Sequence, residues 1–352
     1  MGEVTFCKTD DGSVGLYNAK VGDIYHSTYG AYSEAYEKFI CASNFSNFIK
    51  EHDSVRILDI CYGIGYNTKT ALNEILKIDK KISVQIDALE YDKNLINISP
   101  FIKHQKIDNT INEFIMNNSN FDFGMSFWSV IRYFIKARGI SYVNWLNLID
   151  FKLVNKNKGV LSYPRKFLCP LVHNIYYNYI PFRYKKGQKL SKLSKTSLKF
   201  HSDDARKSIL NLRGKYDFVF LDAFTPKKLP TLWSYEFFKE LYRLLDDNGI
   251  IVTYSSSVAV RSAMIESGFF VGRSTDNNGK IIGTVAAKQK HLIKQNLQEV
   301  DKALLKSKAG IYYRDENLNS SESSITAARE KEVEESTLPS SSSVKKQYES
   351  KK

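Results

Sequence analysis

Residues 55–67, VRILDICYGIGYN, determine the fold of this chain. The first six are mostly apolar and rich in β-branched side chains, so they predict a buried strand. Gly63 and Gly65 predict a tight turn, in which the missing Cβ atoms let the backbone approach a ligand. A helical pattern follows over residues 67–78, with Asn67 as the candidate N-cap. A strand, a glycine turn and a helix N-terminus in this order are typical of α/β sheets that bind nucleotides.

The glycine turn is not the dinucleotide fingerprint, because only two glycines are present and no third follows at that spacing. The pattern D-x-C-x-G-x-G, which begins at Asp59, resembles the acidic-x-G-x-G-x-G loop of S-adenosylmethionine (SAM) methyltransferases, with Cys61 in place of the first glycine. An ordinary buried strand with a β-to-α turn explains this stretch alone equally well.

A second predicted strand, residues 82–89, ends at Glu90. In a doubly wound sheet, an acid at the tip of the second strand can accept both ribose hydroxyls of an adenosine. Glu90 comes 25 residues after Gly65, close to the spacing of about 20 typical of such acids. A solvated charge at a strand end is the alternative.

The composition limits the class of protein. With 352 residues and 43% apolar side chains, the chain can build a substantial core. No run of about 18 apolar residues predicts a membrane span, and the N-terminus lacks the apolar core of a secretory signal. The four cysteines contain no C-x-x-C pair, which argues against disulfides or zinc and favours a reducing, cytoplasmic location.

Residues 100–196 form a predicted insertion, because this length is too great for an ordinary crossover connection. Its first half is aromatic and predicts packed helices. The stretch 151–200 then carries twelve Lys or Arg and no acid, which accounts for most of the net charge of +13. Aromatics interleaved with cations favour RNA binding. The alternative is an aromatic core beneath a solvated basic surface.

The remaining pattern predicts three regions. Residues 1–54 form a β-hairpin (4–7 and 15–18) and a helix from Ser33 to about residue 49. Residues 55–290, apart from the insertion, alternate strands and helices, which predicts a mostly parallel Rossmann-like α/β sheet. Residues 291–352 contain a charged helix and then a Ser-, Glu- and Lys-rich tail from Asn317, which we expect to be largely disordered.

Three separated stretches resemble the methyltransferase module of the MnmC type, a family that methylates the aminomethyl group of the tRNA wobble uridine. Residues 59–67 (DICYGIGYN) are similar to E-x-G-F-G-x-G-x-N. Residues 220–233 (FLDAFTPKKLPTLW) are similar to F-L-D-G-F-x-P-x-x-N-P-x-x-W. Residues 248–269, from NGIIVTY to SGF, are similar to G-G-T-L-A-T-Y followed by V-R and A-G-F. The departures are Cys61, Ala223 and Leu229, which replace glycine, glycine and asparagine, and the basic insertion.

The resemblance implies a stand-alone class I SAM-dependent methyltransferase with no metal. Its expected product is 5-methylaminomethyl-(2-thio)uridine, formed by N-methylation of the 5-aminomethyl group in the tRNA anticodon stem-loop. Asp222, at a strand tip, is the expected catalytic residue that receives or orients the amine; its alternative is a capping acid. The expected cofactor-binding residues are Asp59, Gly63, Gly65, Asn67, Glu90, Asp203 and Asp204. The expected substrate-binding residues are Tyr25, Phe224, Pro226, Arg183, Lys185, Lys186 and Lys189.

Two other functions remain open from the sequence. One is a small-molecule methyltransferase or aminopropyltransferase of similar fold acting on a polyamine-like cation, which the basic insertion disfavours. The other is a catalytically silent RNA-binding protein with Cys61 marking a decayed cofactor pocket, which the presence of Glu90 and Asp222 disfavours.

The cation cluster of the insertion makes a first prediction. Replacing Arg183, Lys185, Lys186 and Lys189 together by Ala should weaken tRNA binding and flatten its salt dependence by up to about four units, at ~0.9 or less for each lost phosphate contact. SAM affinity should stay unchanged. Filter binding across a salt series, with a SAM titration of the same preparation, measures both. An unchanged slope in a folded variant would place the RNA site elsewhere.

Overall fold

The computed structural model describes residues 4–18, 22–25, 29–118, 193–276 and 279–350. Most of the predicted basic insertion, including Arg183, Lys185, Lys186 and Lys189, lies outside these residues. Among the helices of the described part, none is long and apolar enough to cross a membrane.

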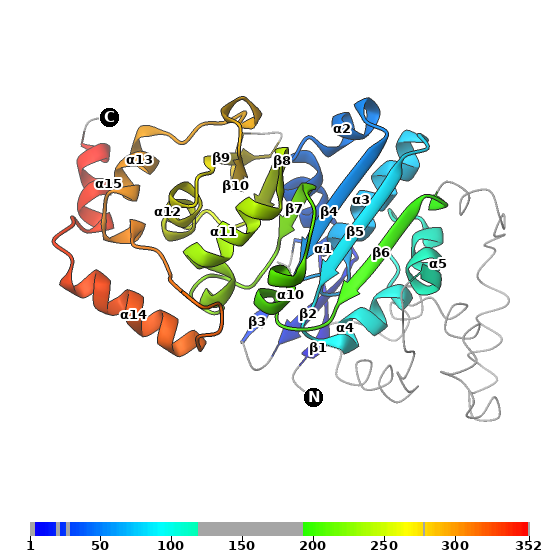
Figure 1. Cartoon of the computed structure of the whole chain (residues 1–352), viewed down its shortest axis with the longest axis horizontal. Coiled ribbons are helices and arrows are strands. Elements are labelled where there is room, and N and C mark those ends of the chain that lie inside the picture. The colour runs from blue at the N-terminus through cyan, green and yellow to red at the C-terminus, as the bar shows by residue number, and fades with distance from the viewer. Residues whose placement is uncertain (1–3, 19–21, 26–28, 119–192, 277–278, 351–352) are drawn as a thin grey trace.

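A seven-stranded sheet with the order β6-β5-β4-β7-β8-β10-β9 runs through the molecule (Figure 1). The first five strands pair in parallel, whereas β10 is antiparallel to both β8 and β9. The mostly parallel Rossmann-like sheet predicted from the sequence is therefore confirmed. The strands, in chain order, are β4 (Ser54–Ile60), β5 (Ser83–Leu89), β6 (Thr196–His201), β7 (Tyr216–Leu221), β8 (Leu245–Thr253), β9 (Phe270–Thr275) and β10 (Ile281–Ala287).

Helices cover both faces of this sheet, because each parallel strand is apolar on both sides. One core cluster lies beneath the N-terminal helices and α3, and a second lies beneath α10 to α12. The helices that follow the strands are α3 (Tyr66–Ile78), α4 (Lys93–Ile98), α5 (Asn109–Asn118), α10 (Ala205–Asn211), α11 (Tyr235–Leu244) and α12 (Val258–Glu266).

The N-terminal region contains the predicted hairpin, β1 (Val4–Lys8) with β2 (Val14–Asn18), and a short third strand, β3 (Asp23–Ile24). The single helix predicted from Ser33 is instead divided. It consists of α1 (Ala31–Ala35), a π-helical segment (Tyr36–Cys41) and α2 (Phe45–Glu51). The break lies at Asn44, whose left-handed backbone (φ 58°) ends the helical path.

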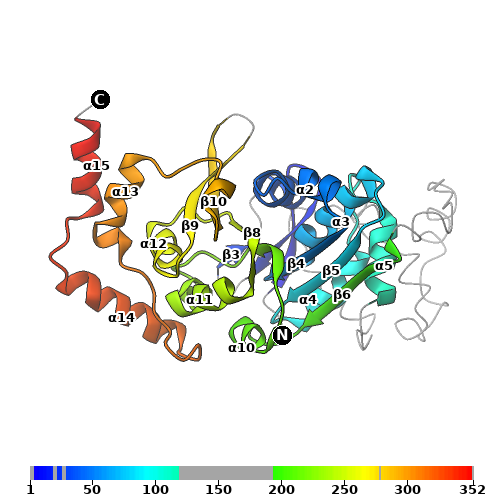
Figure 2. The same ribbon diagram turned by 45° about the horizontal axis from the view of Figure 1, so that its top comes forward.

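The C-terminal region is ordered, so the expectation of a largely disordered tail from Asn317 is wrong. Helices α13 (Glu299–Leu305), α14 (Glu322–Glu335) and α15 (Ser341–Glu349) gather at the β9 end of the molecule (Figure 2). Three apolar side chains, Tyr313, Leu318 and Ile325, are buried in the second core cluster. A few well-spaced apolar residues therefore anchor a segment whose overall composition is polar.

A buried lysine connects α3 to the start of the insertion. Lys69 is 1% exposed, and its Nζ donates hydrogen bonds to the carbonyl oxygens of Ser99 (2.6 Å) and Ile102 (3.2 Å). Burial lowers the pKa of this ammonium from 10.5 to about 7. The carbonyl acceptors keep residues 99–102 against the helix that follows the glycine turn.

Lys69 gives a prediction about stability and pH. Between pH 7 and 10.5 the unfolded chain binds a proton at this site that the folded chain releases, so the free energy of unfolding should rise with pH in that window. Lys69→Met removes this contribution and should flatten the slope by up to about 1.4 kcal/mol per pH unit. Urea denaturation at several pH values from neutral to mildly alkaline measures the difference.

The matched control is Lys77→Met, which changes an exposed lysine on the same helix. It should keep the wild-type slope. A Lys69→Met variant with the wild-type slope would mean that Lys69 stays charged in the folded protein.

Candidate active site

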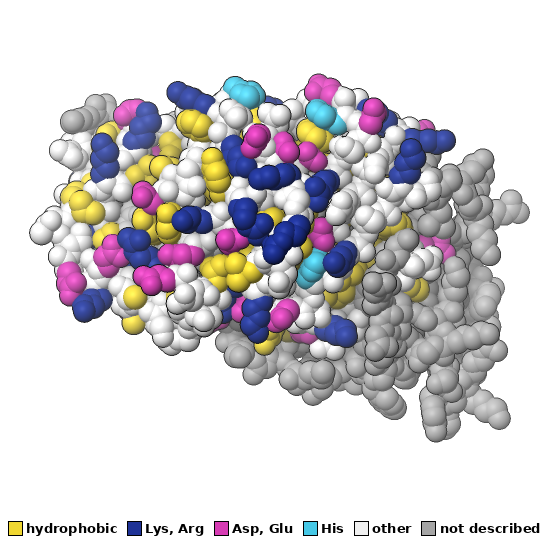
Figure 3. Space-filling view, in the orientation of Figure 1, with side chains coloured by type: hydrophobic (Ala, Val, Ile, Leu, Met, Phe, Trp, Pro, Cys, Tyr) yellow, Lys and Arg dark blue, Asp and Glu magenta, His cyan; other side chains and the backbone are white. Residues whose placement is uncertain are grey.

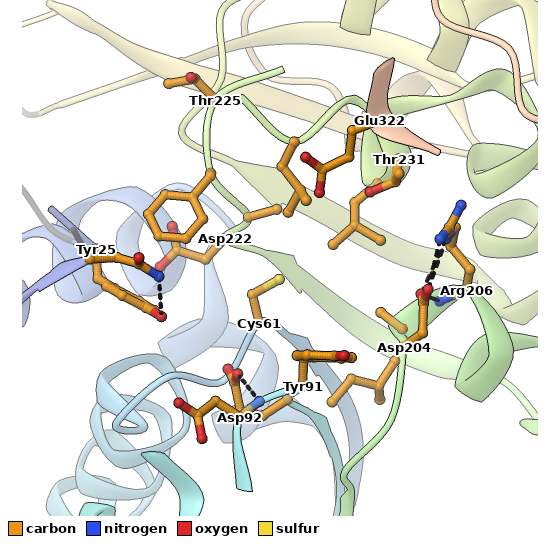
Figure 4. Close-up of a pocket in the computed structure, with 18 of the residues that line it drawn as sticks. Tyr25, Cys61, Tyr91, Asp92, Asp204, Arg206, Asp222, Thr225, Thr231 and Glu322 are labelled. Atoms are coloured by element: carbon orange, nitrogen blue, oxygen red, sulfur yellow. Dashed lines mark hydrogen bonds and ion pairs between the residues drawn. The ribbon is translucent and has the colours of Figure 1, made fainter. Parts of the chain in front are cut away.

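A cavity of about 1490 Å³ opens at the carboxyl ends of β4, β5 and β7 (Figure 4). Crevices at this edge are the usual ligand sites of open α/β sheets. Typical small-molecule sites measure roughly 300–1,000 Å³, so this cavity has room for a cofactor and part of a second ligand. Its lining includes Tyr25, Cys61, Glu90, Asp92, Asp204, Asp222, Phe224, Tyr254 and residues 320–323.

The glycine turn has a left-handed backbone at alternate residues. The φ angles are 65° at Cys61, 58° at Gly63 and 85° at Gly65. Cys61 thus adopts the conformation for which glycine is preferred, at the position where the methyltransferase loop usually has one. A Cβ at Gly63 would have no neighbour closer than Tyr25 Cδ1, at 3.8 Å. A side chain at Gly63 would therefore lie beside Tyr25, which lines the cavity.

Gly65 packs closely against a side chain of the turn itself. A Cβ built on Gly65 would overlap the ring of Tyr62, whose hydroxyl is 2.7 Å from Ser99 Oγ. Ser99 Oγ also donates to the carbonyl oxygen of Ile64 (2.8 Å). The missing side chain at Gly65 makes room for the ring of Tyr62.

Asn67 is not the N-cap of α3, because the helix begins one residue earlier and Gly65 occupies the cap position. Its Nδ2 instead donates to Asp222 Oδ2 (3.0 Å), which joins the glycine turn to the tip of β7. Its Oδ1 is buried and has no hydrogen-bond partner. A buried acceptor of this kind is costly unless a ligand donor satisfies it.

The two acids of the first two parallel strands take different positions. Asp59 is fully buried, accepts a hydrogen bond from Thr68 Oγ1 (2.6 Å), and is absent from the cavity lining. Glu90 lines the cavity and accepts from the backbone amides of Gly63 and Asp92, each at 2.8 Å. Burial raises the pKa of both carboxyl groups to about 7. Asp59 supports the turn from below, and Glu90 faces the cavity.

The neighbouring acids Asp203 and Asp204 are also distinguished. Asp204 lines the cavity, caps α10 and pairs with Arg206 (2.7 Å). The Asp203 side chain is 59% exposed and is not part of the lining. The two acids are adjacent in the sequence, and the turn into α10 gives their side chains different surroundings.

The predicted substrate residues of the described part lie around one side of the cavity. The rings of Tyr25 and Phe224 meet edge to face with centroids 4.8 Å apart, and both line the cavity. Pro226 is buried in the loop beyond Phe224 and does not contribute to the lining. Tyr254, whose hydroxyl donates to the Ala223 carbonyl oxygen (2.7 Å), was not predicted as a site residue.

The site suits SAM by its own geometry. Glu90, at the tip of β5, lines the cavity and accepts a hydrogen bond from the Gly63 amide. Asn67, whose buried Oδ1 has no hydrogen-bond partner, is bonded to the cavity-lining Asp222. Gly63, Asn67 and Glu90 are the residues that would hold the cofactor. No group of three or more His, Cys, Asp or Glu suited to a metal ion occurs in the part of the chain that the structure describes.

Comparisons with known proteins agree with this geometry. Residues 170–289 match a family model described as S-adenosyl-L-methionine-dependent methyltransferase. The structure is similar to MnmC2 from Aquifex aeolicus, with a TM-score of 0.63 and 25% identity over 96% of this chain and 87% of that one. The chain is therefore a SAM-dependent methyltransferase. More particularly, it carries a methyltransferase module of the MnmC type, as the sequence motifs predicted.

Two curated relatives extend the comparison. An uncharacterized protein of Methanocaldococcus jannaschii is 26% identical over 338 residues, which are 94% of this chain and 73% of that protein. The tRNA 5-methylaminomethyl-2-thiouridine biosynthesis bifunctional protein MnmC of Burkholderia vietnamiensis is 39% identical over 66 residues. That match covers 19% of this chain and only 10% of the bifunctional protein.

The two glycines of the turn should respond differently to alanine. Gly65→Ala combines a left-handed backbone with a clash against Tyr62, so it should destabilise the fold by about 1–3 kcal/mol or more. Gly63→Ala carries only the backbone cost of about 1–2 kcal/mol, yet should weaken SAM binding because the new methyl group would lie against Tyr25, a residue of the cavity lining. Thermal denaturation and calorimetric SAM titration of both variants measure these effects. Unchanged SAM affinity in Gly63→Ala would remove the proposed approach of the cofactor to this residue.

Proposed function

We propose that this enzyme transfers the methyl group of SAM to the amine of 5-aminomethyl-(2-thio)uridine at the tRNA wobble position, giving 5-methylaminomethyl-(2-thio)uridine. The observation that carries the proposal is the position of Asp222. Its carboxylate lies at the tip of β7, lines the cavity, and accepts a hydrogen bond from Asn67 of the glycine turn. A base is thereby held beside the turn that is proposed to bind the methyl donor.

The proposed reaction requires a base that removes a proton from the amine, and we assign this role to Asp222. SAM supplies an electrophilic methyl group, and the accepting amine must present a neutral lone pair to it. A primary amine is largely protonated at neutral pH, so a carboxylate within hydrogen-bond reach can orient it and take its proton. Asn67 restricts the Asp222 carboxylate by its hydrogen bond, which favours a single orientation of the base.

The charge of the cavity favours a cationic reacting group. Glu90, Asp92, Asp222 and Glu322 contribute carboxyl groups to its lining. The two cations of the lining, Lys38 and Arg206, each pair with an acid of the same lining, Glu34 and Asp204 respectively. An acidic interior attracts an amine and the sulfonium of SAM. Tyr25 and Phe224 add an aromatic wall suited to a nucleobase.

The outer surface supports a polyanionic partner. Lys and Arg side chains gather over the middle of the face that carries α10 and α11 (Figure 3). Exposed cations of these elements and the adjoining turn are Lys207, Arg213, Lys215, Lys239 and Arg243. Some are partly neutralised, since Glu240 pairs with Arg243 at 2.7 Å. Together with the basic insertion, this surface fits a tRNA, the substrate in the name of the MnmC relatives.

A small polyamine-like acceptor is the second candidate, because the acidic cavity would also attract such a cation. The two are separated by incubating the protein with labelled SAM and either tRNA that carries 5-aminomethyl-(2-thio)uridine or spermidine. Nucleoside mass spectrometry of the tRNA should show the 5-methylaminomethyl product. Labelled spermidine without labelled tRNA would contradict the wobble-uridine proposal.

Asp222→Asn gives the sharpest test of mechanism. It keeps the shape and removes the base, so turnover of tRNA should fall by about 100-fold or more, the scale of general-base catalysis. SAM affinity should stay within about threefold of wild type, a difference of less than 1 kcal/mol. Single-turnover methylation and SAM calorimetry measure the two effects.

Asp92→Asn is the matched control, because Asp92 also lines the cavity and Asn is an equally good cap for α4. It removes the same charge without touching the proposed base and should lower turnover by much less. Equal losses of turnover in the two variants would mean that Asp222 acts only through its contribution to the negative potential of the cavity.

A further inference from the structure

The C-terminal segment forms one wall of the cavity, although it lies some hundred residues beyond the strand that carries Asp222. Residues 320–323 line the cavity at the start of α14. In Figure 4, Glu322 projects into the cavity from the side that also carries Thr231, Asp204 and Arg206, across from Tyr25. The sequence motifs that predict the active site include no residue of this segment.

Arg206 joins this wall to the N-terminus of α10. Its Nη2 donates to Asp204 Oδ2 (2.7 Å), and its Nη1 donates to Asp315 Oδ2 (2.7 Å) and to the Ser320 carbonyl oxygen (2.9 Å). The Asp315 side chain is 0% exposed. One guanidinium therefore holds a cavity-lining acid and the C-terminal segment at the same time, in the fork geometry that suits arginine.

Asp315 also shapes the segment that it anchors. Its Oδ1 accepts hydrogen bonds from the backbone amides of Asn319 (3.1 Å) and Ser320 (3.0 Å). This closes a turn that delivers residues 320–323 to the cavity. Because a buried carboxylate without such partners would be strongly unfavourable, the turn and the ion pair depend on each other.

Apolar contacts hold the other side of the wall. Ile325, one turn into α14, is 2% exposed and belongs to the same core cluster as Leu232 and Trp233, which follow the Asp222 loop. Arg329 donates from Nε to the Ile311 carbonyl oxygen (2.7 Å) and its guanidinium lies 4.8 Å from the Tyr313 ring centroid. Residues 315–323 are therefore held by contacts of the segments before and after them.

We propose that residues 315–323 form a fixed wall that binds the adenosine part of SAM, with Arg206 and Asp315 as positioning residues and Glu322 as a ligand-facing acceptor. The proposal rests on the assignment of SAM to this cavity. An adenosine offers an amino group and two ribose hydroxyls as donors, and the wall presents the Glu322 carboxylate on the same side of the cavity as Asp204. This acceptor is supplied by the C-terminal segment and not by the sheet.

Hydrogen exchange on the wild-type protein tests the wall without any substitution. SAM should slow exchange of the amides in residues 318–325, as well as in the glycine turn, because the bound ligand restricts local opening. Exchange in α15, which does not line the cavity, should be unchanged. Protection of the glycine turn without protection of residues 318–325 would overturn the proposal.

Two pairs of variants then measure the affinity. Glu322→Ala should weaken SAM binding by about 10-fold, the scale of one hydrogen bond to a charged group, whereas Glu334→Ala in the exposed last turn of the same helix should not. Asp315→Asn should weaken SAM binding by at least as much. Its control, Asp301→Asn, changes a carboxylate that also bridges two arginines, Arg261 and Arg273, but lines no part of the cavity.

The outcomes separate this proposal from the one on which it rests. A wild-type protein that does not bind SAM overturns both. If the wild type binds SAM, equal SAM affinities in wild type and Glu322→Ala, or equal losses in Asp315→Asn and Asp301→Asn, overturn the wall alone. Loss of SAM affinity in Glu322→Ala and Asp315→Asn, with tRNA affinity unchanged, supports it.

Discussion

The left-handed turn at residues 61–65 and the start of the helix after it depend on hydrogen bonds to three other parts of the chain. Glu90 at the tip of β5 accepts from the Gly63 amide, and Ser99 holds Tyr62 and the Ile64 carbonyl oxygen. Asn67 reaches across to Asp222 at the tip of β7. A backbone with three positive φ angles, one of them at a cysteine, persists only where its surroundings determine it this completely. The same contacts bring the proposed base, ribose acid and cofactor turn to one edge of the sheet.

Burial raises the pKa of two acids close to the glycine turn. Asp59 and Glu90 both have a pKa raised to about 7 by removal from water, although only Glu90 faces the cavity. A carboxyl group that titrates near neutrality binds a sulfonium-containing ligand more strongly when the pH rises through that value, because its charged form then predominates. The cavity is thus acidic in composition, while Glu90, its most buried acid, is only about half ionised near neutral pH.

The C-terminal region contributes residues to the lining of the cavity. In the Rossmann-like sheet, cavity-lining side chains come from the strand tips, as Cys61, Glu90 and Asp222 do. Here residues far beyond the last strand return to the cavity, and Arg206 of α10 is the link through which they do so. The edge of the sheet and the terminal segment therefore share one set of partly buried ion pairs.

Local pattern alone determined the strands, the glycine turn and the acids Glu90 and Asp222, because alternation of apolar runs and turn residues acts over short distances. The motif resemblance added the SAM-dependent methyltransferase module. Tertiary structure alone decided that Gly65 accommodates Tyr62, that Asn67 contacts Asp222 instead of capping α3, and that Asp59 lies beneath the turn. It also decided that the polar tail is ordered, since a single Arg206 and a buried Ile325 hold it in place. Contacts between residues a hundred positions apart leave no periodic signal in a sequence, whereas strands and turns do.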